Sequence, residues 1–146
     1  MALKALKVIW VFSLAGVLAS FLYVYASLPE KVIVNENPQT IALSKEALFY
    51  MVLALIAIAN VLVFVVTRIY SRNQDDFKAW FYGLTACANL FFVVGLSFIS
   101  LYNSGEKYDF ARLGTIIYGS VGLLLAWAIA WPVYSIAKKI LAKQPV

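Results

Sequence analysis

The sequence contains no histidine, and this absence removes a large part of enzyme chemistry. Bis-histidine haem ligation and the common metal sites use imidazole, as does the base of most hydrolytic triads. Glycine-rich phosphate-binding loops are missing too. We therefore expect no cofactor, no metal and no enzymatic activity.

Cysteine is almost absent as well, since Cys87 is the only one. Quinone-linked disulfide oxidoreductases need paired cysteines, so the chain does not fit that class. A single cysteine also forms no intramolecular disulfide, and cysteine usage therefore gives no indication of compartment. We interpret Cys87 as a small packing residue.

Charged residues are scarce, at 13% of the chain, whereas apolar residues make up 64%. The acidic residues lie only in connections and at helix ends. Proton-coupled multidrug transporters of this size need a carboxylate within the membrane, so that mechanism is disfavoured. The net charge of +5 does not indicate nucleic acid, because the basic residues form no dense patch.

The chain does contain four long stretches without any charged residue, at about 8–26, 47–67, 79–102 and 113–137. Each can cross a hydrocarbon layer of about 30 Å as a helix, which satisfies its own backbone hydrogen bonds. The sequence therefore predicts an all-α integral membrane protein with lipid as its surroundings. The second and third connections are short, which favours an up-down-up-down four-helix bundle. We expect one domain, 1–146, with helices over about 8–27, 45–70, 77–102 and 111–138.

Basic residues gather on one side of the predicted membrane protein. That side, with both termini and the second connection, has eight basic and two acidic residues: Lys4, Lys7, Arg68, Arg72, Lys78, Lys138, Lys139 and Lys143 against Asp75 and Asp76. The other side has four basic and five acidic residues. The positive-inside rule then predicts cytoplasmic N- and C-termini.

The first external connection, at about 28–44, has room for local structure. Short apolar segments at 31–34 and 40–43 flank a polar turn at 35–39, which is the pattern of a β-hairpin. Because an isolated hairpin is unstable, its apolar face should rest on the bundle or on a partner. Ser44 is predicted to cap the second helix.

The same connection carries a partial resemblance to a known family. The segment Ser27-Leu28-Pro29-Glu30-Lys31-Val32-Ile33-Val34, followed by a polar turn and Lys45, resembles the region after the first helix of SdpI-type bacterial membrane proteins. It covers about one fifth of the chain, without the histidine and glycine usual around that turn. The resemblance implies a bacterial multipass protein of immunity, signalling or unknown role, and it assigns no functional residue.

Two asparagines are the most informative polar residues within the predicted spans. Asn60 and Asn89 lie near mid-membrane on adjacent antiparallel helices, so their amides are expected to be able to meet. Thr85 and Ser100 fall on the same stripe of the third helix as Asn89. These residues either join helices by hydrogen bonds or line a site for a lipid or another small molecule.

The fourth predicted helix has a stripe of small residues, which we call the small-residue face: Thr115, Gly119, Gly122, Ala126 and Ala130. Small residues let another helix approach closely. The face could serve internal packing or dock a further membrane protein, and both interpretations remain open at this point.

Three functions are compatible with these patterns. The first is a non-catalytic structural or accessory subunit of a larger inner-membrane complex, with other integral membrane subunits as partners and no nucleic acid. The second is a self-contained lipid- or peptide-binding protein of the immunity type. The third is a small oligomeric transporter of an uncharged substrate.

Overall fold

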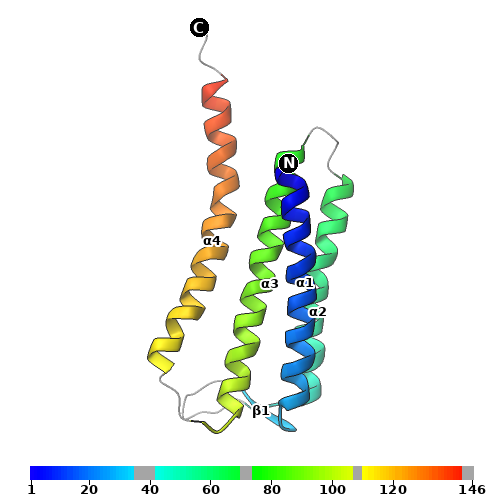
Figure 1. Cartoon of the computed structure of the whole chain (residues 1–146), viewed down its shortest axis with the longest axis vertical. Helices are drawn as coiled ribbons and strands as arrows, with labels where there is room; N and C mark the ends of the chain where they lie inside the picture. Colours follow the sequence, from blue (N-terminus) through cyan, green and yellow to red (C-terminus); the bar gives the residue numbers. More distant parts are fainter. Residues whose placement is uncertain (35–41, 70–73, 107–109, 143–146) are drawn as a thin grey trace.

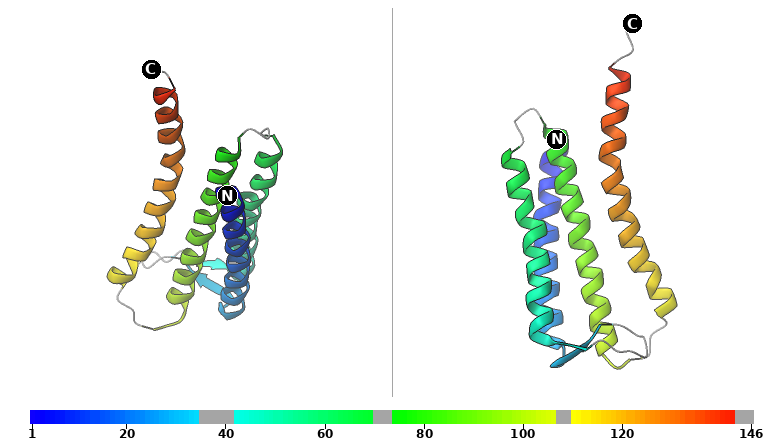
Figure 2. Two further views of the ribbon diagram at one scale, coloured as in Figure 1. Left: turned by 45° about the horizontal axis from the view of Figure 1, so that its top comes forward. Right: turned by 180° about the vertical axis from the view of Figure 1, so that it is seen from behind.

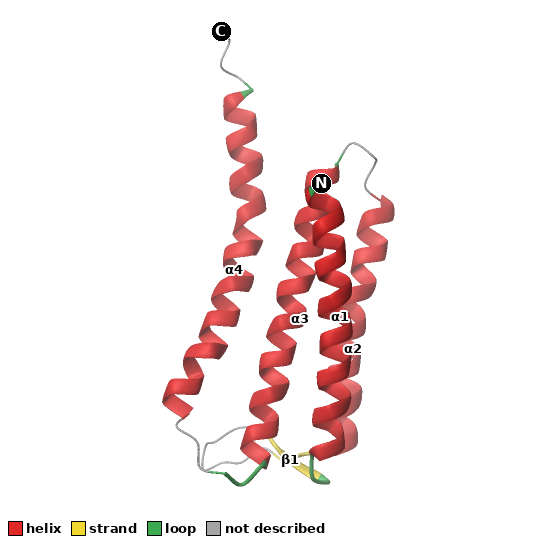
Figure 3. Cartoon of the chain, viewed as in Figure 1, coloured by secondary structure: helices red, strands yellow, loops and turns green. Residues whose placement is uncertain are grey.

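The computed structural model describes residues 1–34, 42–69, 74–106 and 110–142. Its helices are α1 (Ala2–Ser27), α2 (Lys45–Ile69), α3 (Asp75–Asn103) and α4 (Phe110–Leu141), and a short hairpin joins the first two (Figures 1 and 3). All four helices are long and apolar enough to cross a membrane. The predicted four-helix membrane fold is therefore confirmed.

The helices extend beyond the predicted bounds, chiefly at the two chain ends. α1 begins at Ala2, although the prediction began at about residue 8, and α4 continues to Leu141 beyond the predicted 138. The prediction followed the charge-free windows. Lysine is a good helix former whose aliphatic stem tolerates an apolar neighbourhood, so Lys4, Lys7 and Lys138 do not end their helices.

Helix α3 is the centre of the bundle and contacts each of the other three helices. Both α1 and α3 run in the same direction, and α1 packs more extensively on α3 than on its sequence neighbour α2. Helix α4 contacts only α3 among the described elements and stands at one side of the bundle (Figures 1 and 2). The protein therefore consists of a three-helix unit, α1–α3, and a peripheral fourth helix.

Two apolar clusters hold the three-helix unit together. One lies toward the hairpin and includes Val17, Phe21, Ile56 and Leu96. The other lies toward the end where α1 begins and α4 ends, which we call the termini end. It consists of Trp10, Val63 and Tyr82. Ser13, Asn60 and Asn89, described in the next section, each lie between residues of the two clusters along their helix.

The predicted hairpin is present at the opposite end. Strands β1 (Lys31–Ile33) and β2 (Ala42–Ser44) pair antiparallel, with Val32 opposite Leu43. Val32 is fully buried in the apolar cluster, so the hairpin does rest on the bundle. The turn predicted at 35–39 lies outside the described residues.

Side chains of the helices fix the hairpin in place. The Asn103 side chain, at the end of α3, accepts a hydrogen bond from Ile33 N at 2.9 Å and donates one to Ile33 O at 3.0 Å. Ser44 accepts a hydrogen bond from Ala47 N at 3.2 Å, which is the predicted cap of α2. The Lys45 ammonium donates to Leu28 O at 2.8 Å. The hairpin thus covers this end of the bundle and is hydrogen-bonded to both α2 and α3.

Candidate functional site

Asn60 and Asn89 form a reciprocal pair of hydrogen bonds between α2 and α3. The Asn60 Nδ2 donates to Asn89 Oδ1 at 2.9 Å, and Asn89 Nδ2 donates to Asn60 Oδ1 at 3.0 Å. Asn89 is fully buried and Asn60 nearly so. The two amides meet in the way expected from their depth on antiparallel helices.

Helix α1 joins this pair through two residues that sequence analysis did not select. Trp10 Nε1 donates to Asn60 Oδ1 at 2.9 Å, and Asn89 Nδ2 donates to Ser13 Oγ at 2.9 Å. Asn60 Nδ2 also donates to Ile56 O, and Ser13 Oγ to Trp10 O, both at 2.8 Å. We call Trp10, Ser13, Asn60 and Asn89 the polar network; it connects three helices.

Every N–H and O–H of these four side chains has an acceptor within the protein. Among the described residues, no buried side-chain nitrogen or oxygen lacks a partner. A ligand could therefore accept a hydrogen bond here only by breaking an existing one, which would leave a buried polar group unsatisfied. The geometry therefore favours the interpretation that these asparagines join helices.

Thr85 and Ser100, the other two residues of the predicted polar stripe, do not extend the network. The Thr85 hydroxyl donates to Phe81 O in its own helix at 3.1 Å. Ser100 is half-buried, three turns beyond Asn89, and contributes no bond to the network within the described part of the chain. The stripe therefore does not form a single site.

The small-residue face of α4 is exposed along its whole length. This applies to all five of its residues, Thr115, Gly119, Gly122, Ala126 and Ala130. A Cβ added at Gly119 or Gly122 would meet no heavy atom within 4 Å. Within one chain, the small-residue face thus does not serve helix packing.

Helix α4 instead packs on α3 with the side opposite the small-residue face. Successive residues lie about 100° apart around the helix axis, which places the packed residues on that side. The side chains that are at least half-buried on that side are Leu113, Ile117, Ser120, Val121, Leu124, Trp127, Ala128, Trp131 and Ser135. The pattern predicted a helix-contact surface on α4 but selected the wrong side for contacts within the chain. A stripe of small residues is a weak guide to which side of a helix faces its neighbour, because large side chains can also fill a helix interface.

Two tryptophans clasp α3 and α4 together. Trp80 Nε1 donates to Trp127 O at 2.7 Å, and Trp127 Nε1 donates to Trp80 O at 2.9 Å. The Trp127 indole lies directly against Gly83, where any Cβ would overlap the ring. We call Trp80, Gly83 and Trp127 the tryptophan clasp.

Aromatic rings extend the clasp toward the termini end. Trp131 packs against Phe77 and Trp80 with ring centroids 5.0 and 5.8 Å away, and against Tyr134 at 5.7 Å. The sequence indicated only that tryptophans gather toward this end, which is typical of residues at a membrane interface. The structure pairs three of them across α3 and α4.

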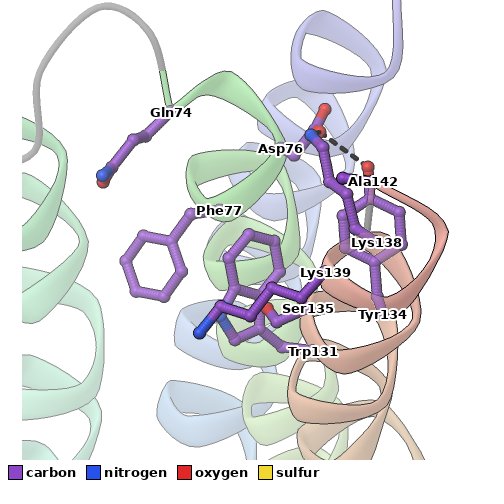
Figure 4. Close-up of a pocket in the computed structure, with 9 residues that line it drawn as sticks. All are labelled: Gln74, Asp76, Phe77, Trp131, Tyr134, Ser135, Lys138, Lys139 and Ala142. Carbon is purple, nitrogen blue, oxygen red and sulfur yellow. Dashed lines mark hydrogen bonds and ion pairs between the residues drawn. The ribbon is translucent and has the colours of Figure 1, made fainter. Parts of the chain in front are cut away.

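A cavity of about 450 Å³ lies beside these rings at the termini end (Figure 4). The Tyr134 hydroxyl donates to Asp76 Oδ2 at 2.8 Å, and Lys138 Nζ lies 3.4 Å from the same oxygen. The lining combines aromatic, basic and polar side chains: Gln74, Asp76, Phe77, Trp131, Tyr134, Ser135, Lys138, Lys139 and Ala142. Among the described residues, no cluster of acidic residues or cysteine suits a metal ion.

No protein-family model, curated protein or solved structure matched the chain. The resemblance to SdpI-type proteins therefore stays a prediction, and function has to be argued from the geometry of the molecule itself.

Proposed function

We propose that the protein is a non-catalytic accessory subunit of a larger membrane protein complex, which docks through the small-residue face of α4. The observation that carries this proposal is the exposure of all five residues of that face while α4 packs on α3 with its other side. Helix association in lipid depends on close packing, and small residues permit it. A surface that only met lipid would gain nothing from being small.

The same proposal includes the kind of membrane in which the protein lies and the orientation of the protein in it. Helix α1 begins, and helix α4 ends, at the same end of the bundle, so Ala2 and Leu141 lie on one side (Figure 1). The excess of lysine and arginine on that side supports its cytoplasmic location, and the bacterial inner membrane rests on the SdpI-type resemblance. A reporter that fluoresces only in the cytoplasm, fused after Val146, tests the orientation; a dark fusion of normal abundance would contradict it.

The alternative functions receive less support. A ligand that accepts hydrogen bonds from Asn60 and Asn89 would need free donors, but all four N–H groups of these amides are already bonded within the protein. The immunity-type role rests on the SdpI-type resemblance alone. For a small transporter, the described residues offer no polar pathway through the three-helix unit, because its buried polar side chains are bonded to one another or to the backbone.

Copurification in a mild detergent tests the accessory role. We expect the wild-type chain to retain a stoichiometric set of larger membrane proteins. Gly119→Leu and Gly122→Leu should each reduce that set at least tenfold, because a leucine side chain separates the two backbones. The matched control is Gly95→Leu on α3, where an added Cβ likewise meets no heavy atom within 4 Å.

Two results would contradict the proposal. One is a wild-type chain that purifies alone. The other is a partner set that survives both α4 substitutions at normal abundance of the protein. If Gly95→Leu releases the partners equally, the loss reflects general instability and the small-residue face is not the docking surface.

A further inference from the structure

A groove runs between α1 and α4. These two helices both pack on α3 but do not contact each other in the described part of the chain. They leave a cavity of about 380 Å³ whose surface consists of apolar atoms. Its floor includes Gly83 and Cys87 of α3, and its walls include Ile9 of α1 and Leu123 of α4.

The groove continues toward the termini end. A second cavity of about 290 Å³ shares Leu6 and Trp127 with the first and adds Trp131 and Tyr134. Along α4, the two cavities extend from Leu123 to Tyr134. At 1.5 Å per residue this length is about 16 Å, close to half of a hydrocarbon core of about 30 Å. The groove therefore has the depth of one leaflet.

The outer end of the groove is polar and basic. Tyr134 and Lys138 of α4 meet there at Asp76, and Lys139 is the next residue along the helix (Figure 4). The aromatic side chains just below have the composition of a membrane interface. Basic side chains at this level attract anionic lipid head groups. The groove is thus apolar where lipid tails lie, and it ends beside the exposed Lys138–Asp76 pair where phosphates lie, with Lys139 lining the neighbouring cavity.

We propose that this groove binds an anionic phospholipid of the leaflet at the termini end. One acyl chain lies between α1 and α4 over Gly83 and Cys87, and the phosphate lies beside Lys138. The size of the groove favours an acyl chain over a protein helix. A helix about 10 Å across fills on the order of 1,200 Å³ over 16 Å, which is more than the two cavities of about 380 and 290 Å³ hold together.

Photo-crosslinking in nanodiscs tests this proposal on the wild-type protein. The probe is phosphatidylglycerol with a diazirine near the end of one acyl chain. We expect adducts at Cys87, Leu90 and Leu123 to exceed those at Leu125 at least fivefold. Leu125 is a suitable reference, because it is exposed on another side of α4. Equal labelling of these positions would overturn the proposal.

A matched pair of variants tests the same site by native mass spectrometry. Leu123→Trp fills the groove, whereas Leu125→Trp places the same side chain outside it. We expect the first to reduce retained phosphatidylglycerol at least fivefold and the second to leave it unchanged. Equal retention in both variants would contradict the proposal, as would a copurified polypeptide that shields the groove from the lipid probe.

A separate experiment tests whether the groove recognises an anionic head group. In wild-type protein, retention of phosphatidylglycerol should exceed that of phosphatidylcholine at least threefold, and Lys138→Gln should remove most of the difference. Equal retention of the two lipids by the wild-type protein would refute recognition of an anionic head group.

Discussion

Helix α3 is held in two different ways on its two sides. Toward α1 and α2 it presents Asn89, which is fully buried and bonded to side chains of both neighbours. Toward α4 it presents the tryptophan clasp, in which each indole donates to a backbone carbonyl of the other helix. The first contact depends on matched side-chain amides and the second on shape, since Trp127 needs the space at Gly83.

This difference explains why α4 can be peripheral while α1–α3 form one unit. The polar network lies between two apolar clusters, so three helices share both polar and apolar contacts. The clasp joins only two helices, and the small-residue face of α4 is left exposed. The first region therefore joins three helices into one unit, and the second attaches the fourth helix, with its exposed face, to that unit.

The largest expected effect comes from breaking the polar network. Asn89→Leu removes three hydrogen bonds and leaves Asn60 and Ser13 partly unsatisfied. We expect a loss of about 2–3 kcal/mol in the free energy of unfolding in bicelles, measured by steric trapping. The double variant with Asn60→Leu should cost less than the sum of the two single changes. A loss below about 0.5 kcal/mol for Asn89→Leu would mean that the network contributes little.

The next effect is expected at the tryptophan clasp. Gly83→Val places a side chain where the Trp127 indole lies, so α4 must shift away from α3. We expect a cost of about 1–3 kcal/mol and a changed spin-label distance between α1 and α4, with the polar network intact. Gly95→Val is the control, because a Cβ there meets open space. An unchanged α1–α4 distance in Gly83→Val would contradict the role of the glycine.

A smaller effect is expected at the hairpin. Asn103→Ala removes the two hydrogen bonds to Ile33, at a cost of about 1 kcal/mol. The Ile33 amide should then exchange its hydrogen several-fold faster. Ser97→Ala is the comparison, since Ser97 bonds only within α3 among the described residues. Unchanged exchange at Ile33 would show that β1 does not need Asn103, because Val32 and the pairing with β2 hold the strand.

The smallest effect is expected at the polar rim of the aromatic cluster. Tyr134→Phe removes the bond to Asp76, but the groups are exposed, and Lys138 and Asp76 are separated by 3.4 Å at the surface. Water replaces such contacts easily, so thermal stability should stay within experimental error. A clear drop in stability would indicate that this rim, and not the clasp, attaches α4.

Local patterns in the sequence predict much of this fold. The length of the four stretches without charged residues predicts the four helices. The apolar segments around a polar turn predict the hairpin. The depth of Asn60 and Asn89 predicts that they can meet. Each of these inferences depends on one segment or on one pair of adjacent helices, which sequence spacing describes well.

The remaining features depend on how each helix is oriented about its axis and on which helices pack together. Trp10 donates its N–H to Asn60 on another helix, a contact that spacing along one segment does not indicate. The preference of α1 for α3 over α2 and the contact side of α4 were not predictable either. In lipid, apolar side chains on every side of a helix are equally soluble, so hydropathy gives little information on rotation.

The small-residue face of α4, which is exposed in the single chain, is proposed to contact another protein. The most direct measurement places a diazirine amino acid at Gly122 and irradiates native membranes, with Leu125 as the reference position. We predict a crosslink from Gly122 to another polypeptide and only lipid adducts from Leu125. A crosslink from Gly122 to α1 or α2 of the same chain would contradict the account, because the small-residue face would then be packed inside the bundle.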